Sequence, residues 1–175
     1  MFEAVSAIGG GIGDVDASAS AEVPVPKVRI GESFSSGDIS VALVGARIAK
    51  PQLKSMFGKG GVGKEPMLNL AFRFANHHDR KVVLFRYNEF LPAIRVRDDV
   101  DNQLRNVGYG SDHVVGELRS GSDILPGATV GHSMVFAVPL PKTESVVVTV
   151  DLECVGEEGK VEFEIPVAKI EGLGA

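Results

Sequence analysis

The chain has 175 residues and a formal net charge of −5 at pH 7, and its 44% hydrophobic and 23% charged residues are ordinary values for a globular protein. This length suits one domain with a full core and excludes two domains of ordinary size. The 21 glycines and 9 prolines, with no long helical periodicity, favour an all-β fold of short strands joined by turns. No stretch reaches the ~18 apolar residues of a membrane span, and residues 1–13 lack the features of a signal peptide.

The beginning of the chain differs in composition from the rest. Residues 1–26 are rich in glycine, alanine and serine without hydrophobic periodicity, which is typical of a tail or linker. We expect the folded domain to span residues 27–170, with residues 171–175 as a C-terminal tail. The chain is then one domain between two tails.

Two strands are predicted at the start of the domain. Val28 and Ile30 open a short strand, and a longer strand runs from Ile39 to Lys50. In the longer strand the hydrophobic alternation changes phase by one residue beside Gly45. A slip of this kind predicts a β-bulge.

The run of residues 58–64, Gly-Lys-Gly-Gly-Val-Gly-Lys, fits the phosphate-binding pattern G-x-x-x-x-G-K. Glu65 stands where a serine or threonine should bind magnesium, and a carboxylate would repel the phosphates. Pro66 and an alternating strand follow, where a phosphate loop needs a helix N-terminus. The preceding residues 52–57 are not a buried hydrophobic strand. We therefore predict a mobile, basic connection between two strands that binds no nucleotide.

Residues 67–75 and 82–87 predict a hairpin at the centre of a β-sandwich, joined by a turn over residues 76–81. Large apolar side chains occupy every second position of the first strand, which places them on one face. Two packed sheets are needed to bury all the alternating apolar faces of the chain. The predicted core is drawn from these strands and the later ones: Leu68, Leu70, Phe72, Phe74, Leu84, Phe136, Val148, Val150, Leu152, Phe163 and Ile165.

After the predicted hairpin, the spacing Asp99-x-Asp101-x-Gln103 offers oxygen ligands as a calcium loop does. Leu104 replaces the glycine that an EF-hand turn requires, however, and the twelfth position is Gly110 instead of glutamate. The segment is therefore predicted to be a hydrogen-bonded Asp/Asn turn.

The second half of the chain alternates between weak and strong strand signals. Residues 106–121 are weakly patterned and predict a loop with one short strand at residues 114–115. Residues 124–127 predict a turn, and residues 130–138 alternate as a strand does.

The strongest strand signal covers residues 145–155, and residues 161–167 supply the last strand. The acidic turn 156–159 between them predicts an antiparallel hairpin. Pro166 suits a sheet edge. Cys154, the only cysteine, falls in the apolar phase and is predicted to be buried and unreactive.

The four histidines, His77, His78, His113 and His132, show no metal-ligand spacing with one another or with the cysteine. The first two lie on a predicted turn facing solvent. His132 lies in the apolar phase of its strand, which favours a hydrogen-bonded core or edge histidine over a ligand-binding one.

The charges are unevenly distributed. Between Arg47 and Arg97 there are eleven basic and three acidic residues, against seven and twenty elsewhere. Pairing with acidic strands of the same fold or of a symmetric neighbour is the favoured interpretation, and a basic surface for an anionic partner is the other. The possible contacts of such a partner are Lys54, Lys59, Lys64, Arg80, Lys81, Arg95 and Arg97.

Four motifs follow one another along the chain: Ile-Gly-Glu at 30–32, Gly-Asp-Ile-Ser-Val at 37–41, Asn-Leu-Ala-Phe-Arg-Phe-Ala-Asn at 69–76, and Leu-Pro-Gly at 125–127 leading into Val-Phe-Ala-Val-Pro. Their order resembles that of small bacterial immunoglobulin-like β-sandwich domains of unassigned function. Such domains occur on lipoproteins and membrane-anchored proteins, and they are similar to secreted immunoprotective antigens of mycobacteria. The resemblance covers about residues 28–168.

The resemblance implies an antiparallel immunoglobulin-like sandwich of seven to nine strands that works outside the cytoplasm, secreted or attached to the cell envelope, with no catalytic residues to carry over. The chain departs from the pattern in the Gly/Lys insertion before Glu65 and in residues 98–121.

The function expected from these observations is that of a non-enzymatic interaction or structural module, with an unknown protein partner or self-association. No serine has plausible histidine and aspartate partners by spacing, and Glu157 and Glu158 lie on a solvated turn, so a hydrolase has no support. No catalytic, cofactor or metal site is predicted. The alternative function is a binder of an anionic ligand or surface through residues 54–97.

Overall fold

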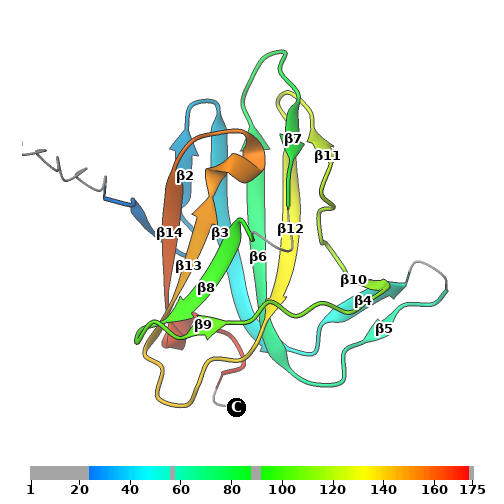
Figure 1. The fold of residues 1–175 in the computed structure, drawn as a ribbon, viewed down its shortest axis with the longest axis vertical. Helices are drawn as coiled ribbons and strands as arrows, with labels where there is room; N and C mark the ends of the chain where they lie inside the picture. Colours follow the sequence, from blue (N-terminus) through cyan, green and yellow to red (C-terminus); the bar gives the residue numbers. More distant parts are fainter. Residues whose placement is uncertain (1–23, 56–57, 88–91, 174–175) are drawn as a thin grey trace, which may run out of the picture.

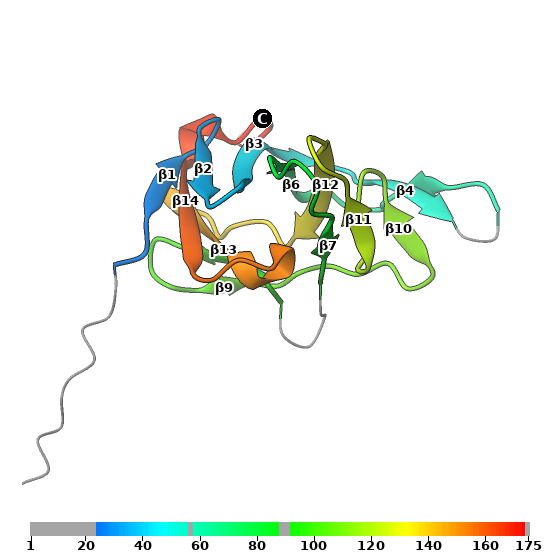
Figure 2. The same ribbon diagram turned by 90° about the horizontal axis from the view of Figure 1, so that it is seen from above.

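The structure is a computed structural model that describes residues 24–55, 58–87 and 92–173. Within them the chain forms fourteen strands and two 3₁₀ helices, η1 (Leu152–Val155) and η2 (Val167–Lys169), arranged as two facing sheets with a projecting arm (Figures 1 and 2). The predicted all-β sandwich is therefore confirmed. The strands outnumber the predicted seven to nine because the sandwich carries several additional strands of only two to four residues.

The first sheet has the order β12-β6-β3-β2, and every pairing in it is antiparallel. Apolar and small or polar residues alternate along the long strand β6, so one face is buried and the other faces outward. The strands are β2 (Ser33–Ser36), β3 (Ile39–Ala49), β6 (Met67–Asn76) and β12 (Thr129–Phe136).

The second sheet has the order β1-β14-β13-β8-β9. The predicted hairpin of β13 and β14 is confirmed, and only β1 runs parallel to its neighbour. β1 pairs with residues 162–164, which leaves Pro166 beyond the pairing on that side. The strands are β1 (Lys27–Arg29), β8 (Ile94–Asp98), β9 (Gln103–Leu104), β13 (Ser145–Asp151) and β14 (Lys160–Pro166).

Two smaller sheets complete the fold. An arm of order β10-β4-β5 projects from the sandwich at the lower right of Figure 1, and a ribbon of β7 and β11 lies at the top. The backbone N–H of Arg86 donates to the carbonyl of Cys154 at 2.7 Å, which ties the ribbon to η1, the 3₁₀ helix that follows β13. The strands are β4 (Gln52–Ser55), β5 (Gly61–Val62), β7 (Val83–Phe85), β10 (Asp112–Val114) and β11 (Ser122–Ile124).

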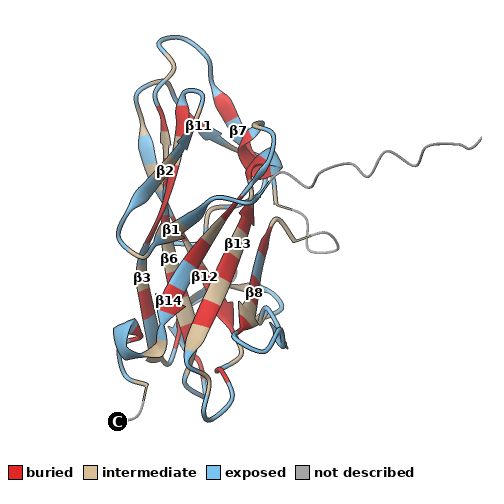
Figure 3. Cartoon of the chain, turned by 90° about the vertical axis from the view of Figure 1, so that its left-hand side faces the viewer, coloured by how far each residue is buried: buried red, intermediate tan, exposed pale blue. Residues whose placement is uncertain are grey.

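The core lies between the two large sheets. Buried residues recur at every second position of β6, β13 and β14 (Figure 3), as expected for strands with one face on a core. All predicted core residues but one are buried. The largest fully buried side chains are Phe72, Phe74, Phe85, Phe136, Phe163, Ile39, Leu43, Leu68, Leu70, Ile94, Ile124 and Ile165.

The predicted hairpin of residues 67–75 and 82–87 is wrong. Both edges of β6 are occupied, by β3 and β12, and β7 pairs with β11 instead. Leu84, assigned to the core, is 39% exposed, whereas Val83 and Phe85 are buried. Buried Asn76 redirects the chain because its side-chain N–H groups donate to the carbonyls of Lys81 and Ile124, at 2.8 and 2.9 Å.

The predicted β-bulge is confirmed. The register of β3 against β6 shifts between Leu43 and Gly45, which pair with Phe72 and Ala71. The extra residue, Val44, is 41% exposed. The bulge therefore keeps the apolar residues on both sides of it on the core face.

Candidate functional site

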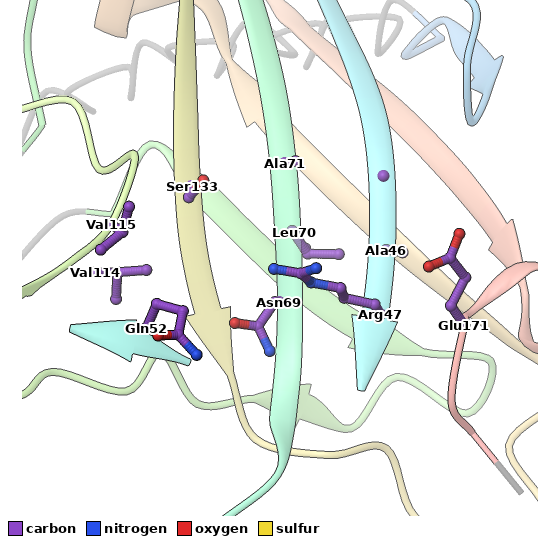
Figure 4. A pocket seen from close by; sticks show the side chains of 11 residues that line it. Ala46, Arg47, Gln52, Asn69, Leu70, Ala71, Val114, Val115, Ser133 and Glu171 are labelled. Atoms are coloured by element: carbon purple, nitrogen blue, oxygen red, sulfur yellow. The ribbon is translucent and has the colours of Figure 1, made fainter. Parts of the chain in front are cut away.

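A groove of about 390 Å³ lies on the outer face of the β12-β6-β3-β2 sheet, beside the arm (Figure 4). Small residues form its floor, where Gly45 pairs with Ala71 beside the bulge. A Cβ added at Gly45 would lie 3.7 Å from the Cβ of Ala71. Figure 4 shows the arm residues on one side and Glu171 on the other. The lining residues are Gly45, Ala46, Arg47, Gln52, Asn69, Leu70, Ala71, Val114, Val115, Ser133 and Glu171.

The arm is held against the sheet edge by backbone hydrogen bonds. Within the arm, the N–H of Val115 donates to the carbonyl of Gln52 at 2.9 Å, which extends the pairing of β10 with β4. The arm is joined to the sheet edge where the N–H of Ser133, on β12, donates to the carbonyl of Gly116 at 2.9 Å. Gly116 has a φ of 87°, and a Cβ there would lie 2.8 Å from the Oγ of Ser133. This contact requires glycine both for the backbone conformation and for the close approach. The wall of the groove is thus fixed to the sandwich.

The opposite wall comes from the end of the chain. The backbone N–H of Ile48 donates to the carbonyl of Glu171 at 2.7 Å, and the N–H of Glu171 donates to the carbonyl of Ala46 at 3.1 Å. Leu173 packs against the core. Residues 171–173, expected to be part of a tail, therefore lie along β3.

A second and larger cavity, which we call the side pocket, occupies about 720 Å³ beside β12. Its residues come from Tyr87, Pro92, segment 105–120 and strand β12. The weak pattern of residues 106–121 predicts a loop with one short strand at residues 114–115, and it gives no indication of either cavity. Both tyrosines of the chain, Tyr87 and Tyr109, line the side pocket. Their positions are the sequence feature that comes nearest to marking it.

His132 lines the side pocket from the core face of β12, and it is 3% exposed. Four aromatic rings have centroids 5.0 to 6.4 Å from its ring: Phe72, Phe74, Phe85 and Tyr87. Its position in the core, on the edge strand of the sheet, agrees with the prediction.

The hydrogen bonding of His132 fixes its tautomer. Nδ1 accepts from the backbone N–H of Leu118 at 3.0 Å, so the proton of the neutral ring must be on Nε2. Burial lowers the pKa of His132 to about 4, which keeps the ring neutral near pH 7. Among the described residues, Nε2 has no hydrogen-bond partner. The predicted hydrogen-bonded histidine is thus satisfied at one nitrogen only.

The rim of the side pocket carries charges of both signs. Glu117 accepts from the backbone N–H of Val114 at 3.1 Å and lies 3.7 Å from Nδ1 of His113. In the part of the chain that the structure describes, Arg105 and Arg119 have no ion-pair partner within 4.0 Å. The remaining acid on the rim is Asp112.

The seven basic residues predicted as possible anion contacts do not all lie together. Lys54, Lys59 and Lys64 are exposed on the arm, while residues 80–81 lie in the β6–β7 connection at the top of Figure 1. Arg95 and Arg97 lie on β8. The structure thus gathers only the three lysines on one small element.

Arg97 is paired within the fold. Its guanidinium contacts Glu162 at 3.2 Å, where the strands β8, β13 and β14 lie side by side, and it also bonds Asp101. The hydrogen bond that its guanidinium donates to Glu162 raises the pKa of Arg97. No other basic member of the seven has an ion-pair partner within 4.0 Å among the described residues.

The glycines of the phosphate-loop-like run serve the arm hairpin. Gly61 and Val62 form β5 and pair with β4, and the chain then enters β6 instead of a helix. A Cβ on Gly60 would clash with the carbonyl oxygen of Leu53, and one on Gly63 would lie 2.8 Å from the ring of Pro51. Close backbone packing therefore accounts for two of these glycines.

Calorimetry with magnesium and ATP is expected to show no heat of binding. A P-loop needs a helix N-terminus with free amides, and the residues after Lys64 lead into a strand. A micromolar dissociation constant that is lost in Lys64→Ala would contradict this prediction.

The predicted Asp/Asn turn is confirmed between β8 and β9. Oδ1 of buried Asp98 accepts from the backbone N–H groups of Val100 and Asn102, at 3.1 and 2.8 Å, and Oδ2 accepts from the side chain of Asn102 at 2.8 Å. The bond from the Asn102 side chain lowers the pKa of Asp98. No group of three or more His, Cys, Asp or Glu in the described residues could hold a metal ion.

The thiol of Cys154 is expected to resist thiol reagents in the native protein. Cys154 is 2% exposed and lies in η1, since β13 ends at Asp151 and not at Val155 as predicted. Burial, and secondarily the Asp151 carboxylate, raises the pKa of the thiol to about 12, so at pH 8 about one molecule in ten thousand carries the reactive thiolate.

Absorbance with a disulfide reagent at pH 8 measures this reactivity, with the protein unfolded in denaturant as the fully reactive control. Stoichiometric labelling of the native protein within minutes would show that the thiol is accessible.

No family model matches the chain, and no curated protein matches it. Solved structures do share its fold. One is the yjhA protein of Bacillus subtilis, with a TM-score of 0.53 and 14% identity over 78% of this chain and 97% of that chain.

A second similar structure is a candidate lipoprotein (ycdA) of Bacillus subtilis, with a TM-score of 0.51 and 16% identity over 77% of this chain and 38% of that one. A third is the secreted protein MPT63 of Mycobacterium tuberculosis, with a TM-score of 0.51 and 9% identity over 82% of this chain and 98% of that chain. At these identities the likeness shows the fold alone. It confirms the resemblance to β-sandwiches of lipoproteins and mycobacterial secreted antigens at that level.

Proposed function

We propose that the protein is a non-enzymatic interaction module that works outside the cytoplasm and binds a protein partner at the groove beside the arm. The groove is the main support for this proposal. It lies on a sheet face, has a floor of small residues, and has walls that backbone hydrogen bonds join to the sandwich. Binding residues on segments positioned by a rigid scaffold are the usual arrangement in sandwich domains.

The exposed apolar residues of the wall favour a protein partner over a small ion. Val115 is 55% exposed and Val114 is half-buried, and both line the same wall of the groove as Gln52 (Figure 4). Burial of exposed apolar surface is the main favourable contribution in most protein association. Arg47 and Glu171 on the other wall supply charges of both signs for orientation.

Site-specific photocrosslinking tests the binding surface. A photoreactive residue at Val115 is expected to form a discrete adduct with the partner in the native cells. Val100 is the matched control, because it is an exposed valine on the β8–β9 turn, 71% exposed and outside the groove. Equal adducts at both positions, or no adduct at Val115, would refute the proposal.

The extracytoplasmic location is supported by the fold shared with a secreted protein and a candidate lipoprotein. No helix in the described part of this chain is long and apolar enough to span a membrane. Expression of the complete native gene with a C-terminal epitope tests the location. Protease added to spheroplasts, whose cytoplasmic membrane is intact, should remove the epitope unless the protein is already in the medium. Full protection of the epitope inside the spheroplasts would contradict an extracytoplasmic location.

The arm favours a second candidate function, the binding of an anionic ligand or surface. Lys54, Lys59 and Lys64 are exposed and unpaired among the described residues, so their charge is free to attract an anion. Retention on a heparin column at low salt, abolished in a folded Lys59→Glu, Lys64→Glu variant, would support this function. Passage of the unmodified protein without retention would exclude it.

A further inference from the structure

We propose that the groove beside the arm accepts an acidic segment of a protein partner. A carboxylate of that segment pairs with the guanidinium of Arg47, and a neighbouring aliphatic side chain packs on Val114 and Val115. This inference rests on the proposed function, because it names the chemistry of the partner at the same groove. The partner then binds through one charged contact and one apolar contact.

Arg47 brings a positive charge into the groove. It is exposed on β3 and pairs in register with Asn69 of β6. Figure 4 shows its side chain extending from β3 across β6 toward the arm, with the guanidinium beside Asn69. No carboxylate lies within 4.0 Å of it among the described residues. Its charge is therefore open to an incoming carboxylate, which a guanidinium can bind through two parallel hydrogen bonds.

Glu171 is the other charged residue of the lining, and it makes no ion pair with Arg47. Figure 4 shows its side chain on the far side of β3 from the guanidinium. The backbone holds it there, since the N–H of Ile48 donates to the carbonyl of Glu171. The two charges thus lie apart, and the one that reaches toward the arm is positive.

The chain that builds the arm side of the groove is basic. Residues 47–66 lead from β3 through β4 and β5 to β6, and their only acidic residue is Glu65. The third arm strand, β10, adds Asp112. Five basic residues stand against these two acids: Arg47, Lys50, Lys54, Lys59 and Lys64. This balance favours a partner segment of negative charge.

The neutral side chains of the groove suit the rest of such a segment. Both N–H groups of the Asn69 side chain donate within the protein, to the carbonyls of Ala49 and Met67 at 2.8 and 2.7 Å. Its Oδ1 points toward the arm in Figure 4, so it can accept from a backbone N–H of the partner. At about 390 Å³ the groove is near the lower end of the roughly 300–1,000 Å³ of ligand sites, so it holds a few side chains.

Three capped tripeptides, with glutamate, glutamine or lysine between two valines, test this inference by NMR on the full chain. We expect the glutamate peptide to shift the Nε–H resonance of Arg47 and the amide of Val115 saturably at pH 7. Its dissociation constant should be about fivefold lower than that of the glutamine peptide, because the two differ chiefly in the charge that faces the guanidinium.

The variant Arg47→Gln removes the charge and should reduce this preference to within about twofold. Arg73→Gln is the matched control, because Arg73 is an exposed arginine on the neighbouring strand β6 that does not line the groove. It should retain the preference. The inference is overturned if no peptide shifts the groove resonances, if glutamine binds as tightly as glutamate, if lysine binds best, or if the preference survives in Arg47→Gln.

The crosslinking experiment at Val115 separates this inference from the proposed function. A discrete adduct at Val115 with equal binding of the glutamate and glutamine peptides would overturn the acidic partner and leave the groove as the binding surface. Absence of the adduct would refute the proposed function itself. An adduct that forms in Arg73→Gln and is lost in Arg47→Gln would support both.

Discussion

Replacing Phe72 by alanine is expected to lower the free energy of unfolding by about 3–5 kcal/mol, as for buried aromatic residues in general. Phe72 is 1% exposed at the centre of the β12-β6-β3-β2 sheet, where it pairs with Leu43 and His132. Its ring lies 6.4 Å from that of Phe74. Removal of the ring therefore leaves a cavity among side chains fixed by three strands.

Chemical denaturation measures this loss, and Arg73→Ala is the matched control. Arg73 is the next residue on the same strand and is exposed, so its replacement should change the free energy of unfolding by less than about 0.5 kcal/mol. A loss below about 1 kcal/mol in Phe72→Ala would contradict the buried position assigned to this side chain.

Acidification from pH 7 to 4 is expected to remove roughly 3 kcal/mol of stability through His132 alone. Burial lowers the pKa of His132 from 6.5 to about 4 in the folded protein. Between these two values the unfolded chain binds a proton that the folded protein does not, so stability falls as the pH falls through this window. Well above pH 6.5 His132 is neutral in both states, so this contribution no longer changes with pH.

Denaturation curves recorded at a series of pH values test this prediction. The slope of stability against pH between 4 and 6.5 should be reduced in His132→Phe and retained in His77→Phe. The slopes are compared and not the absolute stabilities, because His132→Phe also loses the bond that Nδ1 accepts from Leu118. Parallel curves for His132→Phe and the unmodified protein would show that His132 is protonated alike in both states.

The two cavities share a structural origin. Residues 105–118 run along the edge strand β12, bonded to it through the pairs Val107–Val135, Ala137–Arg105 and Ser133–Gly116. An uncovered strand edge would invite pairing with other chains, and this segment covers it. It also forms the arm strand β10 and most of the side pocket, so one irregular stretch both protects the edge and builds the sites.

The sequence alone determined the fold class, the strand β6, the bulge beside Gly45, the β13–β14 hairpin and the turn at Asp98. Each depends on local signals: the alternation of side chains between two faces, or a side chain that bonds its own neighbouring backbone. Such signals act within a few residues and do not depend on which other elements pack against them.

Only the tertiary structure decided that β7 pairs with β11 and that residues 105–120 cover the edge of β12 and line the side pocket. It also decided that only one ring nitrogen of His132 has a hydrogen-bond partner among the described residues. The pairing of β7 with β11 depends on residues about forty positions apart, and the bond from Asn76 to Ile124 spans 48 positions. The bond from Leu118 to His132 likewise joins an irregular segment to β12, 14 positions further along the chain. Short apolar runs fit several partners equally well, so the choice among them is made by the global packing and not by the local pattern.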